Sequence, residues 1–79
     1  MTRTIPVFVN AARVDVRDDA TALEAVRAFD AEAAVEVERG TRLVTDSRGL
    51  PVAADAPVAA GSIFRLVSAR ERDAAPGEA

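Results

Sequence analysis

The sequence predicts a single α+β domain in which one helix packs on one face of a mixed sheet of four to five strands. Three observations lead to this class. Residues 5–17 alternate apolar and polar side chains around a short turn, residues 21–31 carry a capped apolar stripe at helical spacing, and residues 63–67 form a further short apolar strand. A helix on one sheet face is an economical way to bury such elements. With 79 residues, the chain is near the size at which one core is barely sufficient for stability.

Residues 5–9 and 14–17 predict a β-hairpin around a turn at residues 10–12. Apolar residues recur with period two on one face, so we expect that face to point into the core. Pro6 removes one backbone donor from the first strand. Phe8 falls on the opposite face, where a neighbouring side chain either covers it or leaves it exposed. The residues expected to face inward are Ile5, Val7, Val9, Val14 and Val16.

Residues 22–31 predict a helix. Thr21 and Glu24 have the spacing of a capping box, in which each side chain accepts a hydrogen bond from the other residue's backbone N–H. An apolar stripe at helical spacing follows. Its members are Ala22, Leu23, Ala25, Val26, Phe29 and Ala33.

Residues 34–44 admit two predictions. Two valines alternate with two glutamates over residues 35–38, which favours a half-buried strand, a turn at residues 39–40 and another strand. The alternative continues the helix to Glu38, with Gly40 as its C-terminal cap. We favour the strand.

The last part of the chain predicts turns and one more strand. Residues 46–49 and 55–57 have turn compositions, and residues 63–67 form the strand. We expect Phe64 and Leu66 to face the core. Ile63, Arg65 and Val67 then face outward.

The composition argues against several classes of function. The chain has no histidine and no cysteine, so it lacks the residue types that most often bind zinc or carry acid–base and nucleophilic catalysis. We therefore expect no enzymatic activity, no cofactor and no metal site. A net charge of −3 with scattered arginines argues against nucleic acid as a partner. No apolar run approaches the roughly 18 residues of a membrane helix, and the lack of cysteine fits a cytoplasmic protein.

The elements assemble economically when the first and last strands lie side by side in parallel at the centre of the sheet. That is the β-grasp arrangement, and it leaves one sheet face open to solvent. Residues 5–9 resemble the opening strand of ubiquitin, Thr21 and its helix resemble the ubiquitin helix start, and residues 42–44 and 62–67 resemble two later strands. Residues 9–10, 34–37 and 57–61 also resemble bacterial sulfur carriers of thiamine and molybdopterin synthesis. The resemblance covers residues 4–69 and implies a ubiquitin-like β-grasp fold.

The resemblance also implies a division of the chain into a β-grasp domain, residues 1–69, and a flexible tail, residues 70–79. The tail is polar, without an apolar pattern, and contains Gly77 followed by Glu78 and Ala79. A ubiquitin-like modifier made as a precursor would be processed between Gly77 and Glu78. An E1-like enzyme would then activate the Gly77 carboxylate. The implied partners are this adenylating enzyme, an E2-like protein, a processing peptidase and a target protein.

The ubiquitin-like register further implies a partner-binding patch on the open sheet face. Its residues would be Phe8, Val44, Arg65 and Val67, with Arg70 and Arg72 of the tail.

Two other functions stay open. The chain could act as a sulfur carrier with a C-terminal thiocarboxylate, or as a non-covalent β-grasp interaction module whose tail has no role.

Overall fold

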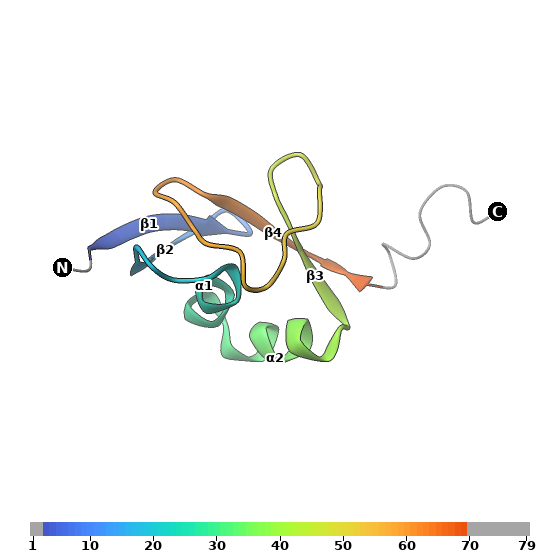
Figure 1. The fold of residues 1–79 in the computed structure, drawn as a ribbon. Coiled ribbons are helices and arrows are strands. Elements are labelled where there is room, and N and C mark those ends of the chain that lie inside the picture. Colours follow the sequence, from blue (N-terminus) through green and yellow to red (C-terminus); the bar gives the residue numbers. More distant parts are fainter. Residues whose placement is uncertain (1–2, 70–79) are drawn as a thin grey trace.

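The computed structural model describes residues 3–69, which form an α+β fold with one mixed sheet (Figure 1). The elements are β1 (Thr4–Val9), β2 (Ala12–Arg17), α1 (Ala22–Phe29), α2 (Ala31–Arg39), β3 (Arg42–Thr45) and β4 (Ile63–Ser68). The strand order is β2-β1-β4-β3. β1 is antiparallel to β2 and parallel to β4, and β3 is antiparallel to β4. The predicted sheet, with the first and last strands parallel at its centre, is therefore confirmed with four strands.

The N-terminal hairpin has the predicted faces. Val7 and Val9 are fully buried, and Val16 is buried on β2. Ile5 and Val14 are partly buried against the same core. A two-residue turn joins the strands, with positive φ at Asn10 (51°) and Ala11 (69°), as in the turns whose twist matches that of paired strands.

Pro6 is tolerated because of where the parallel pairing begins. The first paired residues of β1 and β4 are Phe8 and Ile63, so Pro6 lies before this ladder. Its carbonyl accepts a hydrogen bond from the N–H of Gly61 at 2.8 Å. The missing N–H of Pro6 therefore costs the sheet no ladder bond.

Helix α1 has the predicted capping box but ends at Phe29, two residues before the predicted end. The N–H of Thr21 donates to Glu24 Oε1 at 2.8 Å, and the N–H of Glu24 donates to Thr21 Oγ1 at 3.2 Å. Asp30 then adopts an extended backbone, with its N–H on the carbonyl of Val26. Its Oδ1 accepts the N–H of Glu32 at 3.0 Å, so Asp30 closes α1 and also caps the start of α2.

The predicted strand at residues 34–38 is wrong, because this segment belongs to helix α2. The fold thus has two helices rather than one. Ala33 and Ala34 are buried and Val37 is partly buried, whereas Val35 is 43% exposed. This is helical spacing, since Val35 and Val37 would share a face in a strand. The alternative was right about the end of the helix: Gly40 caps it in the left-handed region at φ 83°.

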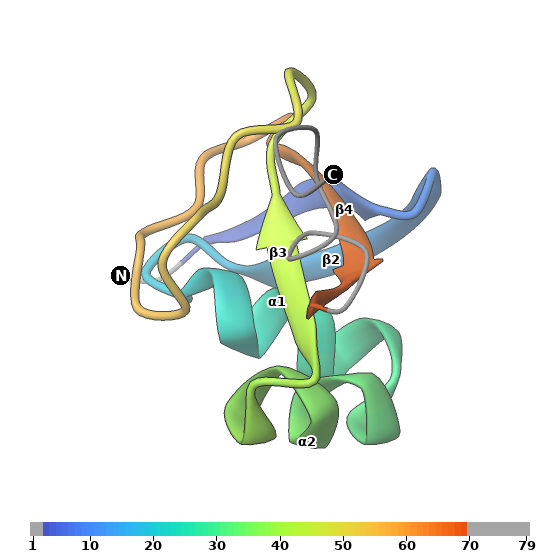
Figure 2. The ribbon, with the colours of Figure 1, turned by 90° about the vertical axis from the view of Figure 1, so that its right-hand side faces the viewer.

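Both helices cover the same face of the sheet. Helix α1 contacts β1 and β2, and α2 contacts β3 and α1. Figures 1 and 2 show the helices together on one side of the strands. The core between the two layers consists mainly of small aliphatic side chains. The buried apolar residues are Val7, Val9, Val16, Ala20, Ala22, Ala25, Val26, Ala33, Ala34, Val44, Val58 and Phe64.

The connection between β3 and β4 contains no further strand. Thr45 and Pro51 form an isolated bridge, as do Thr21 and Pro57. The N–H groups of Ala22 and Leu23 donate to carbonyls of the connection, which holds it against the first turn of α1. Within residues 3–69, neither helix has the length and apolar character needed to cross a membrane.

Candidate partner-binding face

The face of the sheet opposite the helices carries a row of apolar residues from three strands. Alternation along each strand decides which residues lie there, because Val9, Phe64 and Leu66 face the core. Phe8 of β1 is paired with Ile63 of β4, and Leu43 of β3 is paired with Val67 of β4. We call Phe8, Leu43, Ile63, Arg65 and Val67 the outer patch.

The outer patch is partly exposed. Ile63 is 47% exposed, and Arg65 is exposed beside it on the same strand. Phe8, Leu43 and Val67 are half-buried. Half-buried apolar side chains around a single cation form a surface that another protein could cover at low desolvation cost.

Thr45 lies next to Arg65 across the strands but is not part of this exposed surface. It is only 3% exposed, and its hydroxyl donates to the carbonyl of Arg65 at 3.4 Å. This bond satisfies the buried hydroxyl and ties the end of β3 to the centre of β4.

The turn after β1 helps to fix the alignment of β4. The N–H of Asn10 donates to the carbonyl of Phe64 at 3.0 Å, and Asn10 Oδ1 accepts the N–H of Leu66 at 3.0 Å. The Asn10 side chain thus provides β4 with a hydrogen-bond partner at a position where the backbone of β1 has already entered the turn. Because β4 is held in this alignment, its odd-numbered residues Ile63, Arg65 and Val67 lie on the outer face.

Arg13 and Asp15 of β2 and Arg65 of β4 carry the charges that stand at outward strand positions on this face. The Arg17 side chain is directed instead toward α1 and pairs with Asp19. Arg13 Nε lies 3.1 Å from Asp15 Oδ1, and both side chains are more than half exposed. A partner that matches this face would present apolar side chains with carboxylates around them.

The structure brings together three of the predicted site residues and separates a fourth. Phe8, Arg65 and Val67 all lie on the outer face. The placement of Val44 on that face is wrong, because Val44 is 2% exposed and is paired with the core-facing Leu66. Leu43 takes the expected place, since a shift of one residue moves every side chain of a strand to the other face.

Leu43 and Ile63 are the patch residues that the sequence prediction did not include. Alternation along residues 63–67 already placed Ile63 outward, so a signal for it existed. The sequence of β3 contains no such signal, since apolar side chains stand at both Leu43 and Val44. Only the pairing with β4 decides between them. The predicted residues Arg70, Arg72, Gly77 and Glu78, and the predicted tail itself, lie outside the described residues.

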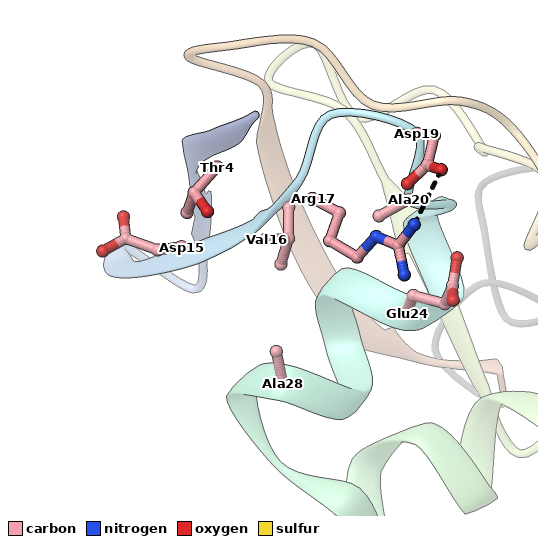
Figure 3. A pocket seen from close by; sticks show the side chains of 8 residues that line it. All are labelled: Thr4, Asp15, Val16, Arg17, Asp19, Ala20, Glu24 and Ala28. Carbon is pink, nitrogen blue, oxygen red and sulfur yellow. Dashed lines mark hydrogen bonds and ion pairs between the residues drawn. The ribbon is translucent and has the colours of Figure 1, made fainter. Parts of the chain in front are cut away.

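A hollow of about 420 Å³ lies between the edge strand β2 and helix α1 (Figure 3). Arg17 reaches across it and forms an ion pair with Asp19 at 3.3 Å. No group of three or more acidic side chains among residues 3–69 is arranged to hold a metal ion, and no buried side-chain polar atom there lacks a hydrogen-bond partner. The hollow is lined by Thr4, Asp15, Val16, Arg17, Asp19, Ala20, Glu24 and Ala28.

No protein-family model matches the sequence, and a search of curated proteins found no match. The candidate site therefore stands on the geometry of the outer patch.

Proposed function

We propose that this chain is a ubiquitin-like protein modifier with a β-grasp fold, processed after Gly77 and joined to a target through the Gly77 carboxylate. The observation that carries the proposal is the place of β4. It is the last strand of the described chain, it lies between β1 and β3 in the sheet, and it ends at Ser68. The C-terminal residues 70–79 therefore follow directly from a central strand that is paired on both sides.

The activation step needs a free glycine carboxylate. A peptidase would first hydrolyse the bond between Gly77 and Glu78. The freed carboxylate would then attack the α-phosphate of ATP on the E1-like enzyme, forming an acyl adenylate and releasing pyrophosphate. A thiolate of that enzyme would displace AMP to give a thioester, which an E2-like protein would receive before transfer to the target. Glycine suits this chemistry because it has no Cβ to crowd a narrow active-site channel.

The outer patch supplies the recognition surface in this proposal. Its apolar residues would pack on the E1-like partner, and Arg65 would meet a carboxylate there. The chain contains no lysine. The acceptor amine of a side-chain conjugate must therefore belong to the target, and the modifier cannot form lysine-linked chains of itself.

ATP–pyrophosphate exchange on the E1-like enzyme tests the proposal. A chain ending at Gly77 should support exchange, whereas a chain ending at Pro76 and the full chain without the peptidase should not. Intact-mass measurement after peptidase treatment should show loss of Glu78 and Ala79 alone. Persistence of the full-length mass, or exchange independent of Gly77, contradicts the proposal.

A matched pair of variants tests the outer patch. Leu43→Asp places a charge in the patch, while Val35→Asp places the same charge on the exposed side of α2. We expect the first variant to lose at least about tenfold in exchange efficiency and the second to keep it, since a buried unpaired charge at an interface is costly. Equal effects of the two would remove the patch from the proposal.

A non-covalent interaction module is the second candidate, and the outer patch favours it because this surface does not depend on the tail. Deletion of residues 74–79 separates the two functions. Partner binding and biological activity would survive the deletion in a non-covalent module. The activity of a modifier, or of a sulfur carrier, would be lost.

A further inference from the structure

Strand β2 forms an edge of the sheet, and no strand within residues 3–69 pairs with its outer side. The N–H of Asp18 donates to the carbonyl of Arg3 at 2.7 Å, so the even-numbered residues of β2 are those whose backbone groups bond to β1. Val14 and Val16 are among these residues. The backbone N–H and C=O groups of Arg13 and Asp15 therefore point away from the sheet. Such an edge is a template for one more strand.

The two edges of the sheet differ in how accessible they are. At the β3 edge, the N–H of Val52 donates to the carbonyl of Val44 at 2.8 Å, so the connection to β4 covers part of it. At the β2 edge, the hollow of Figure 3 opens between part of β2 and α1. The helix thus leaves the outer side of β2 accessible to another chain.

The charges on β2 select the kind of strand that fits. A strand laid antiparallel on this edge gains most by placing an acidic residue opposite Arg13 and a basic residue opposite Asp15, whereas like charges there would repel. The β2 sequence meets this requirement itself when two copies pair about Val14. Arg13 of each copy then lies opposite Asp15 of the other, and two half-buried valines meet on the core side.

The neighbouring registers are unfavourable. Pairing about Asp15 places the two aspartates opposite each other and Arg13 opposite Arg17, so every charged pair is repulsive. Pairing about Val16 requires the carbonyl of Arg17, which already accepts the N–H of Ala20 at 3.0 Å. The register about Val14 uses only backbone groups that point outward.

We propose that β2 is a self-association edge, through which two copies of this chain join their sheets into one antiparallel, eight-stranded sheet. The partner is a second copy rather than an arbitrary extended peptide because the charge pattern complements itself in the register about Val14, where the bonding backbone groups point outward. The edge is short and solvent-exposed, so the dimer dissociates readily and forms with increasing concentration.

Light scattering on the full chain during size-exclusion chromatography, at low salt, tests the proposal. Refractive index must report concentration, because the chain has no tryptophan or tyrosine. The average mass should rise with concentration from 8.3 kDa toward twice that value. Arg13→Asp and Asp15→Arg each place like charges opposite one another, so each variant alone should dimerise at least about tenfold more weakly.

Mixing the two variants gives the decisive result. Arg13→Asp has two carboxylates and Asp15→Arg two guanidinium groups at these positions, so an equimolar mixture should restore the dimer as a heterodimer. Arg65→Asp, on the same sheet face but away from the edge, is the control and should dimerise like the parent. Circular dichroism checks that every variant is folded.

Amide exchange then locates the contact. At high concentration the N–H groups of Arg13 and Asp15 should exchange more slowly, while that of Val14, already bonded within the hairpin, should change little. A parent chain that stays monomeric near millimolar concentration overturns the proposal. So does a dimer that both single variants form as well as the parent, or a strand of another protein that occupies this edge while the chain itself is monomeric.

Discussion

Asn10 Oδ1 accepts the backbone N–H of Leu66 at 3.0 Å, joining residues that are 56 positions apart in the chain. Asn10 stands in the hairpin turn with φ 51°, a conformation that asparagine adopts more readily than most residues. Asn10 thus contributes both to the hairpin turn and to the central strand β4. Its side chain helps to hold β4 in the alignment that places the outer-patch residues of this strand on one face.

Replacing Asn10 should separate these two contributions. Asn10→Gly retains the turn conformation but loses the hydrogen bond, and we expect it to lower the free energy of unfolding by about 1 kcal/mol. Asn10→Ala loses both, and we expect about 2–3 kcal/mol. Urea unfolding followed by circular dichroism measures both values. Equal values for the two variants would mean that the side-chain bond, not the turn conformation, is the main contribution of Asn10.

Ala11→Gly should stabilise the protein. Ala11 has φ 69°, where a Cβ is unfavourable, and the preferred residue after asparagine in this turn is glycine. We expect a gain of roughly 0.5–1 kcal/mol in the same unfolding measurement. Ala12→Gly is the matched control. Ala12 lies in β2, so its replacement should destabilise the protein, and a gain there would contradict this account.

Local signals predicted most of the N-terminal half correctly. The alternation of the hairpin and the capping box at Thr21 each depend on residues close in sequence, and both are present as expected. Asp30 was the missed signal. An aspartate followed by Ala31 and Glu32 is typical of a helix start, yet the apolar stripe continues past it, and only the extended backbone at Asp30 divides the segment into two helices.

The errors on residues 34–44 have tertiary causes. The Val35–Glu38 alternation fits a strand locally, but α2 buries Ala33 and Ala34 against α1 and the sheet, which alternation does not reveal. Likewise Leu43 and Val44 are equally apolar, so the sequence does not decide which one faces the core. The antiparallel register with β4 makes that choice.

Gly40→Ala tests the end of α2. Gly40 has φ 83° and an added Cβ would meet no atom within 4 Å, so the cost should be conformational alone. We expect a loss of about 1 kcal/mol in the free energy of unfolding. Gly40→Asn should lose less, because asparagine tolerates this conformation better than alanine. If alanine were neutral here, the glycine cap would not be what ends this helix.

The loss of unfolding free energy at acidic pH should depend on Asp46. Its Oδ1 accepts the N–H groups of Leu50 at 3.0 Å and Arg48 at 2.8 Å, within the turn that follows β3. The N–H of Leu50 is the largest cause of the lowered pKa of this carboxyl. The N–H and guanidinium of Arg48 also lower the pKa, and partial desolvation opposes them.

The direction of the pH effect follows from this lowered pKa. A folded-state pKa below the unfolded value near 3.8 means that the ionised form stabilises the fold. The contribution is complete above that pH and is lost as the pH falls through the lower, folded-state pKa. Asp46→Asn keeps an acceptor oxygen but cannot titrate, so its unfolding free energy should fall less steeply below about pH 4. Urea unfolding of both proteins from about pH 6 to 2 measures the difference, and an NMR titration of the Asp46 carboxyl carbon reports the pKa directly. Parallel pH curves for the two proteins, with an ordinary Asp46 titration, would show that the turn does not favour the charged carboxylate.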